Sequence, residues 1–163
     1  MQRNLIPFDP ATVPNAAKMR IGIVVSEWNQ EVTAALFTGA YDTLISFGCK
    51  KENIIRKNVP GSFELPAGAM FFAEYEDIDA VICLGCVVQG ETRHFEFICN
   101  AISKGLVDLS IKFGMPFIFG VLTTDTLQQA KERSGGKIGN KGIEAAVTAI
   151  KMIALQREFE VRK

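Results

Sequence analysis

The chain of 163 residues lacks the features that mark several common classes of protein. Its 18 basic and 18 acidic residues balance, so no excess of charge indicates nucleic acid or an anionic membrane surface as a partner. No apolar run approaches the roughly 20 residues that cross a bilayer, and the amino-terminal segment lacks the apolar block of a secretory signal. These absences predict a cytoplasmic protein that binds neither nucleic acid nor membrane.

Several catalytic motifs are missing as well. No G-x-G-x-x-G follows the first predicted strand, which excludes the nicotinamide and FAD fingerprint. The glycine-rich segment 136–142 has no strand before it and no G-K-[ST], so it is not a Walker loop. The chain also has no G-x-S-x-G elbow of a hydrolase and no acidic cluster for metal-dependent phosphotransfer.

Four cysteines are present, and two of them form a C-x-x-C pair. Cys83 and Cys86 both fall within a predicted strand, where residues three positions apart point to opposite faces of a sheet. Redox pairs of this spacing begin a helix instead, and a zinc site would need further Cys or His ligands at a suitable spacing. We therefore interpret Cys83 as a core residue and Cys86 as core or pocket wall.

Strands and helices alternate along the chain. Residues 1–18 contain three prolines and no periodicity, which predicts an extended N-terminal arm outside the core. Residues 19–163 are predicted to form a single domain. The predicted strands cover residues 20–25, 53–59, 80–88 and 116–122. Because helical patterns follow these strands, the sequence predicts an α/β domain with a parallel sheet and helices on both faces.

Three local expectations refine this outline. The polar second strand should lie near an edge of the sheet. Thr123, Thr124 and Asp125 are possible N-caps for a helix that reaches Arg133. The glycine-rich segment 134–142 is expected to be a mobile link before the last helix.

The most unusual residues follow the carboxyl ends of the predicted strands. Trp28 and Asn29 follow the first strand, the segment 62–64 the second and the segment 90–94 the third, and the segment 119–124 lies at the end of the fourth. Because these ends meet at one rim of a parallel sheet, where ligands bind, we expect the turns to form one site. His94 is the only histidine, and it opens a helix whose backbone amides also hold anions.

Each of these residues also has a structural interpretation. Trp28 and Phe63 are either stacking platforms for a flat heterocycle or loop aromatics folded onto the core. Glu64 either caps its helix or accepts hydrogen bonds from ligand hydroxyls. Arg133 either binds a phosphate or is a solvated cation at a helix end. His94 taken alone is better explained as a helix cap or as a residue that rests on a core face.

Four blocks of sequence resemble the lumazine synthase family, which catalyses the penultimate step of riboflavin biosynthesis. The densest blocks are residues 59–66, 84–94, 119–124 and 129–142. The resemblance implies a three-layer, flavodoxin-like fold with a four-stranded parallel sheet. It also implies a transferase that condenses 5-amino-6-(D-ribitylamino)uracil with (S)-3,4-dihydroxy-2-butanone 4-phosphate. The products would be 6,7-dimethyl-8-ribityllumazine, phosphate and water, and neither a metal ion nor an organic cofactor would be needed.

The resemblance also assigns roles to residues. His94 matches the proton-transfer residue, Trp28 the aromatic that stacks on the pyrimidine, and Arg133 the phosphate-binding arginine. Phe119 matches a pocket residue that the neighbouring subunit supplies, and Lys141 a lysine near the site. The other matching positions are Ser62, Phe63 and Glu64 at the pyrimidine and ribityl chain, Cys86, Val87 and Val88 along the same pocket, and Glu91 and Thr92 at the butanone phosphate.

The sequence departs from the family pattern at two positions. Trp28 stands where the family usually has phenylalanine, and the larger indole changes the floor of the pocket. Gln89 replaces a basic residue that often precedes the Gly-Glu-Thr turn, which predicts weaker binding of the butanone phosphate.

The resemblance further implies self-association. The family forms pentamers with active sites between adjacent subunits, and some members close twelve pentamers into an icosahedral capsid. The short link 134–142 lacks the insertion of members that stop at pentamers, which favours the shell here. Riboflavin synthase is a further expected partner.

Three other classes of protein are alternatives to a lumazine synthase, and each would need different features. A non-catalytic flavin- or lumazine-binding carrier would keep Trp28 but would not need both His94 and Arg133. A flavodoxin-like electron carrier would need a phosphate loop rich in Ser, Thr and Gly at residues 26–29, where this chain has Ser-Glu-Trp-Asn. A purely structural shell protein would assemble without turnover.

Overall fold

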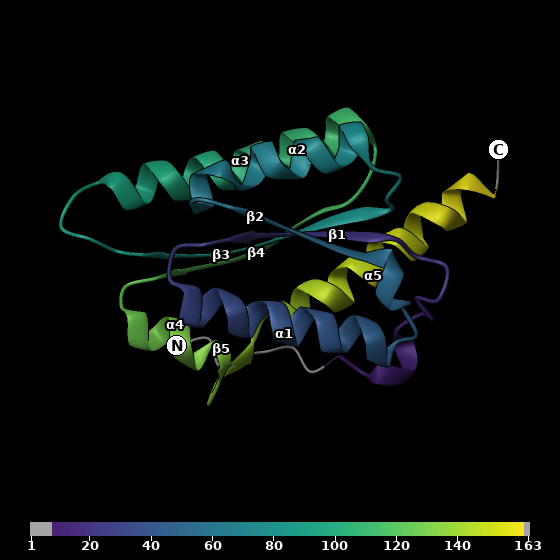
Figure 1. Ribbon diagram of the computed structural model, residues 1–163, viewed down its shortest axis with the longest axis horizontal. Helices are drawn as coiled ribbons and strands as arrows, with labels where there is room; N and C mark the ends of the chain where they lie inside the picture. Colours follow the sequence, from purple (N-terminus) through teal and green to yellow (C-terminus); the bar gives the residue numbers. More distant parts are fainter. Residues whose placement is uncertain (1–7, 162–163) are drawn as a thin grey trace.

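A parallel four-stranded sheet forms the middle layer of the protein, as the computed structural model of residues 8–161 shows (Figure 1). The strands are β1 (Ile21–Ser26), β2 (Ile54–Val59), β3 (Ala80–Val88) and β4 (Phe117–Thr124). Their order is β2-β1-β3-β4 and every pairing is parallel, so each connection crosses one face of the sheet. The predicted three-layer, flavodoxin-like α/β fold is confirmed.

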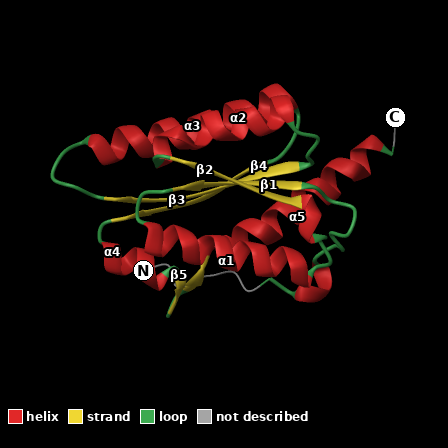
Figure 2. Ribbon diagram, viewed as in Figure 1, coloured by secondary structure: helices red, strands yellow, loops and turns green. Residues whose placement is uncertain are grey.

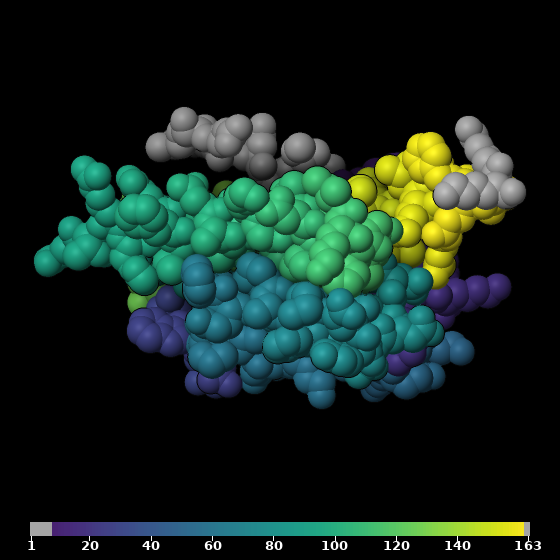
Figure 3. Space-filling model, turned by 90° about the horizontal axis from the view of Figure 1, so that it is seen from above, coloured from purple at the N-terminus to yellow at the C-terminus, as the bar shows by residue number. Residues whose placement is uncertain are grey.

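Helices cover both faces of this sheet (Figure 2). One face carries α2 (Leu65–Tyr75) and α3 (His94–Phe113). The other carries α1 (Gln30–Ser46), α4 (Leu127–Glu132) and α5 (Lys141–Glu160). The space-filling view from above shows α3 as a ridge beside α2, with the amino-terminal end of α3 projecting beyond it (Figure 3). That projecting end carries His94, the first residue of α3.

Each face of the sheet has its own apolar core. All six residues of β1 are buried, and because successive side chains point to opposite faces, Ile23 joins the cluster under α1 and α5 while Val24 joins the cluster under α2 and α3. Cys86 belongs to the first cluster and Cys83 to the second. The prediction that these two cysteines point to opposite faces is therefore confirmed.

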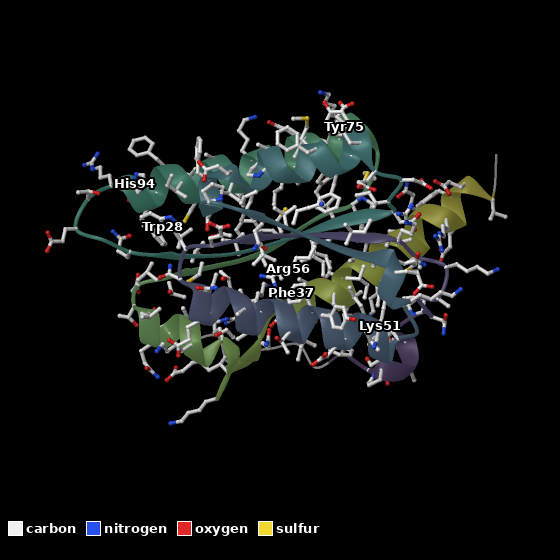
Figure 4. The ribbon with its side chains drawn as sticks, in the orientation of Figure 1. Trp28, Phe37, Lys51, Arg56, Tyr75 and His94 are labelled. Carbon is white, nitrogen blue, oxygen red and sulfur yellow. The ribbon has the colours of Figure 1, made fainter. Side chains whose placement is uncertain are left out.

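The polar strand β2 lies at an edge of the sheet, as predicted. Its middle residues Arg56 and Lys57 are exposed. The guanidinium carbon of Arg56 lies 4.3 Å from the ring centroid of Phe37 in α1, so the cation rests on an aromatic face (Figure 4).

The N-cap of α4 is a residue that the sequence interpretation missed. Thr123 and Thr124 are not caps, because they continue β4 and pair with the end of β3. The cap is Thr126, whose hydroxyl accepts a hydrogen bond from the backbone N–H of Gln129 at 3.2 Å. The side chain of Gln129 accepts one in return from the backbone N–H of Thr126 at 3.3 Å, which completes a capping box.

The expected mobile link before the last helix is a small hairpin instead. β5 (Ser134–Gly136) pairs antiparallel with β6 (Gly139–Asn140). Gly135 and Gly139 have φ angles of 118° and 99°, values that L side chains rarely adopt, so glycine permits this tight reversal. The hairpin ends at Asn140, whose side chain caps α5 by accepting from the backbone N–H of Gly142 at 2.8 Å.

The expected amino-terminal arm lies partly outside the described residues, which begin at Phe8. A single turn of 3-10 helix covers Pro10–Thr12. The expectation that the arm stays out of the core is wrong for Ala16, which is fully buried in the cluster under α1 and α5. The division of the chain at residue 18 stays a prediction.

Among the helices of residues 8–161, none combines the length and the apolar character that crossing a bilayer requires.

Candidate active site

A cleft of about 790 Å³ opens at the carboxyl ends of the strands. This volume lies within the roughly 300–1,000 Å³ typical of small-molecule sites. Two turns, the end of β3 and the start of α3 contribute to its walls. The lining residues are Trp28, Asn29, Pro60, Gly61, Ser62, Phe63, Glu64, Cys86, Val87, Val88, His94 and Ile98.

The turn between β1 and α1 presents Trp28 to the cleft. The indole is 72% exposed, and Figure 4 places it at the same end of the molecule as His94. The next residue, Asn29, has a φ of 55° and is the one non-glycine residue with positive φ among residues 8–161. Its side-chain amide donates a hydrogen bond to the carbonyl oxygen of Cys86 at 3.1 Å. Asn29 thereby ties the tryptophan turn to the end of β3.

The turn after β2 is held by Glu64. One carboxylate oxygen of Glu64 accepts a hydrogen bond from the backbone N–H of Gly61 at 3.0 Å. Ser62 is buried, and its hydroxyl donates to that of Ser26 at 3.5 Å. The ring of Phe63 is left 57% exposed on the cleft wall. Glu64 therefore stabilises the single 3-10 turn Ser62–Glu64 and lines the cleft. The expectation that it caps the helix that follows is wrong, because it occupies the N-cap position of α2 without a side-chain hydrogen bond there.

The end of β3 forms an apolar wall. Cys86 is almost fully buried, and burial raises the pKa of its thiol to about 11. The thiol therefore stays protonated at neutral pH and is not an activated nucleophile. Val87 and Val88 are half-buried and continue this wall toward solvent.

His94 stands at the rim where α3 begins. Its side chain is exposed, and its backbone N–H donates weakly to the hydroxyl of Thr92 at 3.4 Å. Ile98, one helical turn further on, lines the same cleft. The imidazole thus faces an opening that also contains two exposed aromatic rings, an arrangement suited to proton transfer on a flat ligand.

The structure gathers most of the predicted site residues and leaves four outside the cleft. Glu91 and Thr92 lie in the exposed turn before His94. Phe119 is half-buried in β4 and packs against the core under α2 and α3. Arg133 ends α4, where its guanidinium lies 3.9 Å from a carboxylate oxygen of Glu144.

Four lining residues had no predicted role in the site: Asn29, which the sequence had placed at this rim, and Pro60, Gly61 and Ile98. A sequence signal existed for all four. Asn29 and the Pro-Gly pair directly adjoin residues that were selected. For Ile98 the signal was its i+4 spacing from His94 on one helix face.

Within the described part of the chain, no group of three His, Cys, Asp or Glu side chains is arranged to hold a metal ion.

The comparisons with known proteins agree on one family. The family model described as 6,7-dimethyl-8-ribityllumazine synthase matches residues 18–157. A protein of that name from Cytophaga hutchinsonii is 58% identical over 142 residues, which cover 87% of this chain and 89% of the relative. Proteins of the same name from Parabacteroides distasonis and Christiangramia forsetii are 54% and 50% identical. The alignments cover 93% and 98% of this chain, and 94% and 96% of those relatives. The chain therefore belongs to the 6,7-dimethyl-8-ribityllumazine synthase family.

Proposed function

We propose that the cleft condenses 5-amino-6-(D-ribitylamino)uracil with (S)-3,4-dihydroxy-2-butanone 4-phosphate to 6,7-dimethyl-8-ribityllumazine, phosphate and water. Membership in the family supports this reaction. The observation that carries it is the meeting of Trp28, Phe63 and His94 in one cleft. Two exposed aromatic rings suit a flat pyrimidine, and the sole imidazole of the chain stands beside them.

The pyrimidine binds between the aromatic turns in this proposal. Trp28 stacks on its ring, and the segment 62–64 contacts the ring and the ribityl chain. The apolar wall of Cys86, Val87 and Val88 excludes water from one side of the ring. Holding both substrates in this space converts a slow bimolecular encounter into a reaction within one complex, which supplies much of the rate.

His94 moves protons during the condensation. The amine of the pyrimidine attacks the ketone, a first water leaves as the Schiff base forms, and phosphate is eliminated. The ribitylamino nitrogen then attacks the remaining carbonyl, and the ring closes with loss of a second water. Each of these steps needs a proton delivered or removed near neutral pH, and an imidazole does both. His94 is free for this role because its side chain is exposed at the rim of the cleft.

The phosphate end of the site is completed by a second copy of the chain. Arg133 and Phe119 do not line the cleft of their own subunit, so we assign them to the cleft of a neighbour in a pentamer. Glu91 and Thr92 lie next to His94 and hold the phosphate from the other side. Each active site then takes its residues from two subunits.

Exposed apolar side chains support such an assembly. Phe97 and Ile111 on α3 are 70% and 78% exposed, and Phe159 near the end of α5 is 63% exposed. Side chains of this size gain free energy when another subunit covers them. The short hairpin between α4 and α5 favours closure of twelve pentamers into a capsid. We further propose riboflavin synthase as a partner and the cytoplasm as the location.

The test is turnover by the purified protein. The two substrates are mixed with it, and lumazine fluorescence is followed against a control without enzyme. We expect acceleration that falls in His94→Ala by about 10²–10⁴-fold, the usual contribution of an acid–base group, and that also falls in Arg133→Ala. Lys51→Ala is the matched control, because this exposed lysine lies at the opposite end of the molecule (Figure 4). A folded assembly that binds the pyrimidine without accelerating the reaction would be a carrier and would refute the proposal.

A further inference from the structure

A carboxylate lies between two cations where α5 begins. Glu144 is in the first turn of α5, and its Oε2 lies 2.9 Å from Nζ of Lys141. Its other oxygen, Oε1, lies 3.9 Å from a guanidinium nitrogen of Arg133. Oε1 is buried, and within residues 8–161 it has no hydrogen-bond partner. One oxygen of the carboxylate is therefore satisfied, and the other faces Arg133 without bonding to it.

The backbones that carry these side chains are fixed. The N–H of Lys141 donates to the carbonyl oxygen of Arg133 at 2.9 Å. The side-chain amide of Asn140 donates to the carbonyl oxygen of Ala35 in α1 at 3.0 Å. α5 also approaches α1 so closely that a Cβ at Gly142 would overlap backbone atoms of α1. The guanidinium of Arg133 can thus move only by rotation of its own side chain.

The geometry indicates attraction without a bond. A separation of 3.9 Å is too long for a hydrogen bond, yet opposite charges at this distance attract strongly in a partly buried site. A buried carboxylate oxygen without a partner is destabilising, so such groups are rare in folded proteins. A guanidinium carries five donors in a planar fork, so one edge of Arg133 can face Glu144 while the other binds a phosphate.

We infer that Glu144 is a positioning residue for the phosphate site: its carboxylate, itself fixed by the ammonium of Lys141, holds the guanidinium of Arg133 in place to receive the phosphate of the butanone substrate. This inference rests on the proposed function, in which Arg133 binds that phosphate. Glu144 acts through Arg133 and does not touch the substrate itself.

The first test is the kinetics of Glu144→Gln, which keeps the shape of the side chain and removes its charge. We expect the KM for the butanone phosphate to rise about tenfold, the loss expected for one charge-assisted contact. The KM for the pyrimidine and kcat should change less than about threefold, because the chemistry is untouched. Glu144→Asp keeps the charge and should recover most of the affinity.

Glu31→Gln is the matched control for the loss of one carboxylate. Glu31 forms an exposed ion pair with Lys131, the residue two positions before Arg133, at 2.8 Å. The variant Glu31→Gln carries the same substitution in a salt bridge of the same region. We expect no change in the KM for the butanone phosphate or in the KM for the pyrimidine. A rise in KM equal to that of Glu144→Gln would show a general charge effect and would overturn the positioning role.

A double-mutant cycle separates this inference from the proposed function. If Glu144 acts through Arg133, then Glu144→Gln has no further effect on the KM for the butanone phosphate once Arg133→Ala is present. An unchanged KM in Glu144→Gln, with a raised KM in Arg133→Ala, would overturn the positioning role and leave the function intact. An unchanged KM in Arg133→Ala would instead remove the phosphate role of that arginine, and the inference would fall with it.

Discussion

Trp28 gives this protein an optical reporter inside its own cleft. It is the only tryptophan of the chain, and its indole is largely exposed on the cleft wall. Any ligand that stacks on it changes the fluorescence of a single, identified residue. Binding can therefore be measured separately from turnover, which distinguishes an enzyme from a carrier.

We predict that the ribitylaminouracil quenches Trp28 fluorescence and that Trp28→Ala weakens its binding. Stacking of a base on an aromatic side chain contributes about 1–3 kcal/mol, so calorimetry should show a Kd roughly 5–150 times higher in Trp28→Ala. Trp28→Phe keeps an aromatic face and should bind within a few-fold of the unchanged protein. Equal losses in both variants would argue against stacking.

At the residue scale, the sequence predicted which residues lie at the site but not which side chains contact each other. The isolated histidine and tryptophan could be placed at strand ends because buried strands are easy to recognise from long apolar runs. That Asn29 binds the end of β3, or that Glu144 faces Arg133, depends on contacts between segments far apart in the chain. Such pairings are invisible to periodicity and spacing.

The start of helix α4 is set by its N-terminal capping box. It has only six residues, so its start depends on the cap more than on intrinsic helix propensity. The capping box of Thr126 and Gln129 satisfies two backbone N–H groups reciprocally. Because Arg133 is the C-cap directly after the last residue of α4, the position of this helix also determines where that arginine lies.

We predict that Thr126→Ala destabilises the protein by about 1 kcal/mol, the usual cost of a lost N-cap. Thermal or urea unfolding would measure the loss. Thr123→Ala is the control, because this exposed threonine lies three residues away in β4 and caps no helix. If the two variants lose the same stability, the capping box is not what holds the start of α4.

At the element scale, the four strands of the sheet and the helices were predicted from the sequence, while the start of α4 and the β5–β6 hairpin were not. β3 was predicted at its observed bounds because nine apolar or small residues in succession fit a strand buried on both faces. β4 continued past its predicted end because Thr123 and Thr124, which resemble caps, pair with β3 instead. The β5–β6 hairpin was missed because glycine-rich segments favour loops and tight turns alike.

At the scale of the whole molecule, the proposed site is split between copies of the chain. The cleft holds His94, and Arg133 lies outside it. A heterologous contact in a closed ring repeats the same pairing around the ring, so every subunit would both give and receive catalytic residues. An isolated subunit would bind the pyrimidine but lack the phosphate half of its site.

We predict that two impaired variants restore each other. Co-expressed His94→Ala and Arg133→Ala chains should form mixed rings in which about a quarter of the sites pair an intact histidine with an intact arginine from the neighbour. Activity of the purified mixed assembly should rise to about that fraction of the unchanged protein. Variants assembled separately and then combined without exchange are the control. No recovery in verified mixed rings would place both residues in one subunit's site.

The left-handed backbone at Asn29 places a limit on engineering this protein for heat resistance. The side chain of Asn29 donates its hydrogen bond to the carbonyl oxygen of Cys86 and does not cap α1, so this helix begins without a side-chain cap. A designer would choose Gly here to relax the backbone, or Asp or Ser to cap the helix. Either choice would release the tryptophan turn from β3. A substitution at position 29 that raises the melting temperature would therefore also loosen the turn that holds Trp28 in the cleft.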